Sequence, residues 1–196
     1  MRGVLALSPT LFLALATSFG CAASGDRALT AYGGRYADAS LPEDILVLQP
    51  VTWESSELAA LAYTEVLQRI HDERAQWEWE AQVAKHFGAQ THWEFNALFA
   101  LRWNRYPWDE YVRTSFAVGD GISYATEVPP LEARGHADTG STRVLNYILL
   151  EFALGLPSQP SWDLVMRIHH RSGIFGLIDG VDGGSNVIAV GLKYAF

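Results

Sequence analysis

Apolar and polar residues alternate along most of this chain with a period of two. The clearest example is the stretch 92–104, where every second side chain is apolar and the residues between them start with His92 and Glu94 and end with Arg102. The apolar face consists of Trp93, Phe95, Ala97, Phe99, Leu101 and Trp103. This period is typical of a β-strand whose two faces meet different surroundings. The pattern therefore predicts an all-β fold.

Eight segments carry this pattern or fit between clear turn signals. They lie at residues 28–36, 56–69, 74–87, 92–104, 111–125, 142–155, 161–172 and 185–196. A soluble sandwich would bury the aromatic face and expose the charged face to water. Tryptophan at both ends of one apolar face instead favours a lipid-facing surface between two aromatic girdles. We therefore expect an eight-stranded antiparallel transmembrane β-barrel of the outer-membrane type, with Phe196 ending the last membrane strand.

The connections between these segments support the same fold. The connections predicted at one end, around His71-Asp72, Tyr106-Pro107 and Pro157–Pro160, are short. Those predicted at the other end are 37–55, 88–91, 126–141 and 173–184, and all of them except 88–91 are long. Short turns at one end and mostly long loops at the other are typical of outer-membrane barrels, with the long loops outside the cell. The apolar stretch Asp44–Trp53 fits poorly, and we expect it to extend a strand above the membrane or to fold as a lid.

The N-terminus has the features of an export signal. Arg2 precedes two apolar runs, and small residues around Cys21 form a cleavage region, so we interpret 1–24 as a signal peptide and 25–196 as one barrel domain. A buried N-terminal helix is the alternative. Cys21 is the only cysteine and is a candidate for lipidation, although Ser18-Phe19-Gly20 is a poor lipobox. The predicted location is the bacterial outer membrane, as an integral protein.

Charge and histidine spacing exclude several functions. The formal net charge is −8, which argues against a nucleic-acid partner. The histidines outside 161–172 show no metal-ligand spacing, and no strand-loop-helix context supports phosphate binding at Gly180–Gly184, so we expect no metal and no cofactor. These histidines are His71, His86, His92 and His136. Charged residues predicted to face the lumen are expected to form a buried ionic network: Glu78, Glu80, Glu94, Glu151, Arg102, Arg167 and Lys193.

The segment 167–173 is the most informative for chemistry. By strand parity His169 and Arg171 point into the lumen, and His170 and Ser172 point towards lipid, near the outer-leaflet surface. A histidine two residues from a serine on one strand face can activate the hydroxyl for acyl transfer. Alternatively, both residues contact lipid head groups at the rim. Arg134, Arg143 and Arg171 are predicted near this rim, within reach of lipid phosphates.

Residues His170-Arg171-Ser172-Gly173, the loop 180–184 and the final strand resemble the lipid A 3-O-deacylase (PagL)-like, or acyloxyacyl hydrolase, family of outer-membrane barrels. The specific resemblance covers 142–196. It implies that His170 is the general base and Ser172 the nucleophile of an esterase that removes an acyl chain from lipid A of lipopolysaccharide.

Two positions depart from the family pattern. Gly173 stands where the family has an Asn, which leaves the Gly173 backbone N–H as the oxyanion donor. No Glu begins the last strand to orient the histidine, so Asp182 is the nearest carboxylate, with a role in an Asp-Gly turn as its alternative. Asn146 is a second candidate for orienting His170, because it shares the outward face of the neighbouring strand; otherwise it is a polar rim residue.

The expected partners are the membrane and lipopolysaccharide in its outer leaflet, and the sequence leaves a homodimer open. The alternative is a non-catalytic barrel with a structural or adhesive role, which the missing Glu and Gly173 favour. A soluble periplasmic β protein is the third hypothesis.

Overall fold

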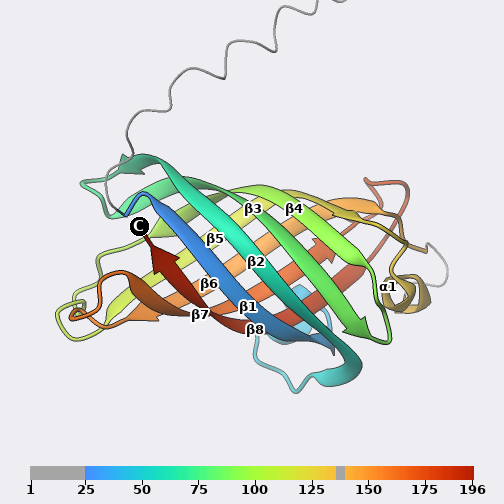
Figure 1. Cartoon of the computed structure of the whole chain (residues 1–196). Helices are drawn as coiled ribbons and strands as arrows, with labels where there is room; N and C mark the ends of the chain where they lie inside the picture. Colours follow the sequence, from blue (N-terminus) through green and yellow to red (C-terminus); the bar gives the residue numbers. More distant parts are fainter. Residues whose placement is uncertain (1–24, 136–139) are drawn as a thin grey trace, which may run out of the picture.

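The structure is a computed structural model that describes residues 25–135 and 140–196. The predicted signal peptide, Cys21 and His136 lie outside the described residues. Eight strands follow one another around a closed barrel: β1 (Arg27–Asp38), β2 (Thr52–Ile70), β3 (Ala75–Gly88), β4 (Trp93–Trp103), β5 (Arg113–Ala125), β6 (Val144–Gly155), β7 (Trp162–Ser172) and β8 (Gly184–Ala195). Each strand pairs antiparallel with the next, and β8 closes the barrel on β1 (Figure 1). The predicted eight-stranded antiparallel barrel is confirmed.

Strand β2 is longer than the sequence pattern indicates. It begins at Thr52 rather than at residue 56, because Thr52 and Trp53 pair with Asp38 and Ala37 beyond a register shift in β1. The stretch Asp44–Trp53 therefore divides into three parts, and residues 46–51 in its middle belong to no helix or strand. Its first residues belong to a short π-helix, η2 (Leu41–Ile45), and its last two start β2. The expectation that this stretch extends a strand is therefore correct only for Thr52 and Trp53.

The two ends of the barrel differ in their connections, as predicted. The short-turn end carries 71–74, 104–112 and 156–161 and the chain end Phe196. The long-loop end carries 39–51, 89–92, 126–143 and 173–183, and includes η2 and the helix α1 (Pro130–Gly135). Strand β7 runs towards the long-loop end, so its last residues, His170 to Ser172, lie there (Figure 1).

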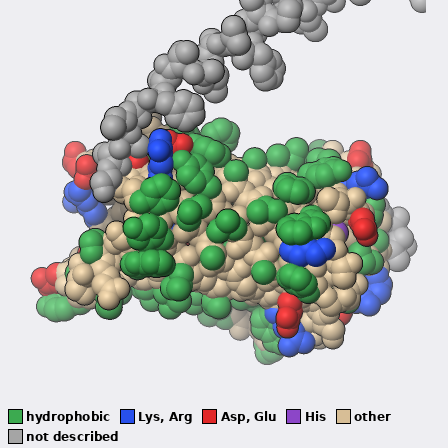
Figure 2. All heavy atoms as spheres, in the orientation of Figure 1, with side chains coloured by type: hydrophobic (Ala, Val, Ile, Leu, Met, Phe, Trp, Pro, Cys, Tyr) green, Lys and Arg blue, Asp and Glu red, His purple; other side chains and the backbone are tan. Residues whose placement is uncertain are grey.

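The outer surface of the barrel is an apolar band between two groups of exposed aromatics. One group lies at the short-turn end: Trp77, Trp103, Trp162, Tyr194 and Phe196. The other lies at the long-loop end: Trp53, Phe87, Trp93 and Tyr124. Figure 2 shows hydrophobic side chains over the middle of the visible face and charged side chains gathered at the two ends. This distribution matches a surface that contacts lipid between two aqueous interfaces.

No helix in the described ranges is long and apolar enough to cross a membrane.

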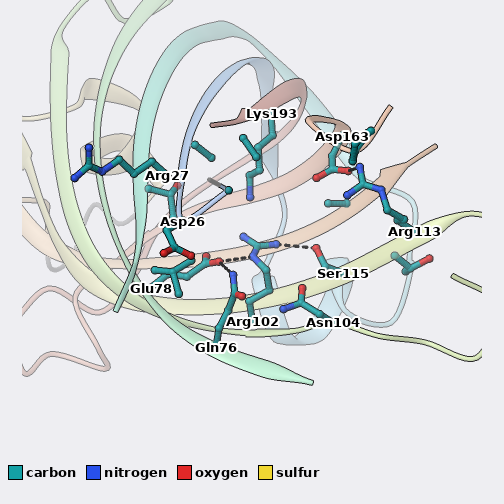
Figure 3. A pocket seen from close by; sticks show the side chains of 18 of the residues that line it. Asp26, Arg27, Gln76, Glu78, Arg102, Asn104, Arg113, Ser115, Asp163 and Lys193 are labelled. Atoms are coloured by element: carbon teal, nitrogen blue, oxygen red, sulfur yellow. Dashed lines mark hydrogen bonds and ion pairs between the residues drawn. The ribbon is translucent and has the colours of Figure 1, made fainter. Parts of the chain in front are cut away.

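The lumen is filled by paired charges. Arg167 contacts Glu80 at 2.8 Å and Glu151 at 2.5 Å, and Arg102 contacts Glu78 at 2.8 Å and Glu151 at 2.7 Å. Lys193 also pairs with Glu151. Figure 3 shows the part of this network that lines a cavity of about 320 Å³ at the short-turn end, where Arg102 reaches both Glu78 and Ser115. The predicted ionic network is confirmed, and it leaves the buried charges paired, as a narrow lumen requires.

Helix α1 is attached to the lumen at the long-loop end. Glu132 accepts two hydrogen bonds from Arg171 Nη1, at 2.8 and 2.9 Å, and one from Ser185 Oγ at 2.6 Å. Both Glu132 and Arg171 are buried. Arg171 is therefore not available to lipid phosphates, because its guanidinium is buried in an ion pair with Glu132.

Candidate functional site

Strand parity places His170 and Ser172 on the outward face of β7. Residues 165, 167, 169 and 171 are buried in the lumen, whereas the alternate positions from 164 to 172 are exposed or half-buried. Across β8, His170 pairs with Asn186, and across β6, Ser172 pairs with Asn146. The candidate site is thus a group of polar side chains from three adjacent strands on the apolar outer face.

Asn186 holds the ring of His170. His170 Nδ1 lies 2.8 Å from Asn186 Oδ1, and Asn186 Nδ2 donates to the Ala39 carbonyl oxygen at 2.6 Å. A carbonyl can only accept a hydrogen bond, so the contact with Ala39 fixes the amide nitrogen on that side and turns the amide oxygen to His170. His170 Nδ1 therefore carries the proton that Asn186 Oδ1 accepts, which leaves Nε2 as the nitrogen that can act as a base.

The hydroxyl of Ser172 is close in sequence to this base but is not yet engaged with it. Ser172 Oγ accepts a hydrogen bond from the Ile174 backbone N–H at 3.0 Å. Among the described residues, no hydrogen bond joins Ser172 and His170. Catalytic hydrogen bonds are often long in ligand-free enzymes and tighten when substrate binds. The two side chains share one face of β7, two residues apart, while the Ser172 hydroxyl is bonded to the backbone of the following loop.

Asn146, the second candidate for orienting His170, has other partners. Its Nδ2 donates to Asp120 Oδ1 at 2.8 Å and to the Gly121 carbonyl at 2.9 Å. Its Oδ1 is buried and has no hydrogen-bond partner among the residues that the structure describes. Asp120 itself lies on the outward face of β5, where a carboxylate is unfavourable in contact with lipid. The structure thus adds Asp120 to the polar group and sets Asn146 beside Ser172 rather than against His170.

The loop after β7 determines what Gly173 and Asp182 can do. The Gly173 N–H donates to the Gly183 carbonyl at 2.8 Å, so it is occupied in this structure. A Cβ at position 173 would lie 2.0 Å from the Val181 carbonyl oxygen, which explains why Gly stands here instead of an Asn. Asp182 is exposed and lines the same cavity as His170 and Ser172. The structure thus places Asp182 in the wall of this cavity.

Backbone strain is concentrated in this loop. Ile174 and Phe175 have φ of 51° and 52°, in the left-handed region that a β-branched residue rarely adopts. Such strain costs about 1–3 kcal/mol per residue and is found preferentially at functional sites. It lies immediately beside Ser172, because Ile174 is the residue that donates to the serine hydroxyl.

A cavity of about 520 Å³ opens over His170 and Ser172. Its other walls come from the end of β1, η2, α1 and the loop after β7. Phe175 lines it and has 90% of its surface exposed, and Leu177 in the same loop is 80% exposed. Arg134 at the rim of the cavity pairs with Glu54 at 2.7 Å. Apolar groups beside a polar, partly charged rim fit an amphipathic ligand.

Sequence reasoning missed Asn186 and Asp120. Asn186 lies four residues after Asp182, at the start of the last strand, where the family pattern predicts a carboxylate and not an amide. The signal that identifies it is strand register: once Ser172 pairs with Gly184, His170 must pair with Asn186. Asp120 is detectable as the one carboxylate on the outward face of the predicted strand 111–125, between Val118 and Ile122.

Comparisons with solved structures confirm the fold. The outer membrane enzyme PagL superposes with a TM-score of 0.58 at 9% identity, over 86% of this chain and 99% of the other. Neisserial surface protein A (NspA) superposes with a TM-score of 0.51, also at 9% identity, over 88% and 98%. No protein-family model matches the sequence, and no curated protein matches it. The chain has the fold of small eight-stranded outer-membrane barrels.

Proposed function

We propose that this protein is an integral outer-membrane esterase that removes an ester-linked acyl chain from lipid A. Ser172 is the nucleophile, His170 the general base, and Asn186 the residue that positions His170. The observation that carries the proposal is the fixed His170–Asn186 pair beside Ser172 at the long-loop end of a lipid-facing surface. A site there meets lipids of the outer leaflet, not solutes in the lumen.

The reaction proceeds in two steps that return the enzyme to its starting state. Ser172 Oγ attacks the ester carbonyl while His170 Nε2 takes the hydroxyl proton. The tetrahedral intermediate collapses, and the sugar oxygen leaves with the proton from His170. Water, deprotonated by the same nitrogen, then attacks the acyl-serine. The serine oxygen leaves with that proton from His170, and a free fatty acid is released. The oxyanion needs a donor, and the Gly173 N–H serves if its bond to Gly183 opens when substrate displaces the strained loop.

Two other features support an amphipathic substrate. Phe175 lines the cavity and Leu177 is exposed in the same loop, so both provide apolar surface for acyl chains. Arg134 offers a guanidinium to phosphate if it exchanges its exposed contact with Glu54. Asp120 holds Asn146 next to Ser172, which explains a carboxylate on a face otherwise given to lipid.

The decisive test is lipid A mass spectrometry. Purified barrel in detergent micelles with lipopolysaccharide should reduce the lipid A mass by one acyl chain and release the matching fatty acid. Ser172→Ala should abolish both signals. The control is His71→Asn in the exposed turn at the opposite end, where φ is 51° and Asn is tolerated. An unchanged lipid A, or the same loss of mass with Ser172→Ala, would overturn the proposal.

The second candidate is a non-catalytic barrel with a structural or adhesive role. It is favoured by the absence of a hydrogen bond between Ser172 and His170 among the described residues and by the occupied Gly173 N–H. This candidate predicts binding of lipopolysaccharide without release of fatty acid, and equal binding by Ser172→Ala.

A further inference from the structure

Three potential metal ligands converge inside the barrel at the long-loop end. His86 on β3 lies directly opposite His92, to which its backbone N–H donates at 3.0 Å, and Glu94 follows two residues later on β4. All three are buried, and the ligand atoms they offer lie within 4.8 Å of one another. His86 Nε2 is 3.0 Å from Glu94 Oε2, and the two imidazole rings stack at 4.1 Å.

An independent observation is that the ring nitrogens of His92 are unpaired within the described part of the chain. Neither Nδ1 nor Nε2 makes a hydrogen bond there, although the side chain is only 2% exposed. Buried polar groups are almost always paired, so a buried imidazole with two free nitrogens needs an explanation. The buried Oε1 of Gln90, in the same short connection, also has no hydrogen-bond partner among residues 25–135 and 140–196. A bound cation would satisfy the ring of His92.

The surrounding contacts orient the other two ligands. Glu94 Oε1 accepts hydrogen bonds from Ser123 Oγ at 3.0 Å and is 2.8 Å from His169 Nε2, which leaves Oε2 directed towards His86. The Gln90 amide lies 3.3 Å from His86 Nδ1. Metal-binding histidines and carboxylates are typically held in this way by hydrogen bonds to their remaining atoms. The cluster therefore has an outer layer of supporting contacts as well as ligands.

We propose that His86, His92 and Glu94 form a binding site for a divalent transition-metal ion of the zinc class. Two imidazoles and one carboxylate suit Zn²⁺ and disfavour Mg²⁺ and Ca²⁺, which prefer all-oxygen sites. Water completes four-coordination. The Gln90 amide, once turned, accepts from His86 Nδ1–H, because a ring that ligates through Nε2 carries its proton on Nδ1. Ligands at about 2.0–2.2 Å from the ion require the ligand atoms to move closer together than 4.8 Å, through side-chain rotations of His86 and His92.

The site connects the β3–β4 hairpin to the far wall of the barrel, because Glu94 also contacts His169 on β7. Its place in the lumen separates it from Ser172 and His170, which face outward. The proposal is thus independent of esterase activity. Histidine spacing in sequence did not reveal it, because the ligands alternate with outward residues on two paired strands.

The test is metal binding by the refolded full barrel in detergent, stripped with chelator. Titration with Zn²⁺ followed by calorimetry should give one ion per chain, and Co²⁺ should give the visible absorption of a four-coordinate site. His92→Ala should weaken binding by about 100-fold or more, since loss of a supporting contact alone costs about 10–100-fold. Ser123→Ala, which removes such a contact, should weaken binding by about 10-fold.

His71→Asn is the matched control, because it removes an exposed histidine at the opposite end and should leave the stoichiometry at one. Circular dichroism and migration of unheated samples in gels establish that each variant has refolded. If His92→Ala does not refold, Glu94→Gln takes its place and should also lose the Co²⁺ spectrum. Unchanged affinity in a folded His92→Ala or Glu94→Gln barrel, or binding lost with His71→Asn, would overturn the proposal.

Discussion

Two consecutive histidines on β7 have opposite environments. His169 points into the lumen, where Nε2 lies 2.8 Å from Glu94 and Nδ1 lies 3.1 Å from Tyr147 Oη and 3.2 Å from Tyr32 Oη. His170 points outward, with Nδ1 held by Asn186 at 2.8 Å. A histidine with both nitrogens engaged has no lone pair to offer a substrate. Hydrogen bonding of the ring nitrogens, more than burial of the side chain, therefore separates a structural histidine from a catalytic candidate.

The largest effect is expected in the lumen, at Glu151. This carboxylate pairs with Arg102, Arg167 and Lys193, and it is fully buried. Glu151→Gln keeps the shape and removes the charge, so buried cations lose a shared partner. We expect the free energy of unfolding to fall by about 3–5 kcal/mol, measured by urea unfolding of the refolded barrel. The control Glu73→Gln breaks an exposed pair with Arg105 and should change little. Equal stability of both variants would show that the lumenal charges do not hold the barrel together.

His170→Ala tests the outward half of the comparison. Without the base, release of fatty acid should fall by about 10²–10⁴-fold, while unfolding in urea stays within about 0.5 kcal/mol of the parent protein. A variant that loses stability in proportion to activity would instead assign His170 a structural role.

His169→Ala is the matched variant one residue away. It leaves Glu94 without the contact at 2.8 Å and two tyrosine hydroxyls without an imidazole. We expect a loss of about 1–3 kcal/mol in unfolding free energy and little change in the rate of acyl release by the folded protein. If His169→Ala and His170→Ala gave the same profile of stability and activity, the distinction between the two faces would fail.

The barrel could be predicted because its information is local and repeated. Alternation in a stretch such as 92–104 records which face meets lipid, and it needs no knowledge of the neighbouring strands. Parity counted from Phe196 and along β7 therefore placed His170, Ser172 and Asn146 on the correct face. The start of β2 was misplaced because its first residues, Thr52 and Trp53, pair with β1 beyond a register shift. The period of the sequence does not show such a shift.

The partners within the site could not be predicted in the same way. They depend on register between strands, on loop path and on amide orientation. Gly173 illustrates the dependence on loop path, because only the path of the loop brings the Val181 carbonyl close enough to exclude a side chain. Asn186 illustrates the dependence on amide orientation, since its contact with Ala39 decides which amide atom faces His170.

The smallest effect is expected at Asn186, which acts on substrate only through His170. Asn186→Ala should lower acyl release by about 10-fold, equivalent to about 1.4 kcal/mol of transition-state stabilisation, because the ring is free to rotate and to change tautomer. Asn186→Asp restores an acceptor for Nδ1–H and should recover activity relative to Ala. Its carboxylate also favours the protonated ring, so the acidic limb of the pH–rate profile should move to higher pH. Since a role limited to packing predicts neither recovery nor a shifted limb, the profile of Asn186→Asp separates positioning of the base from stabilisation of β8.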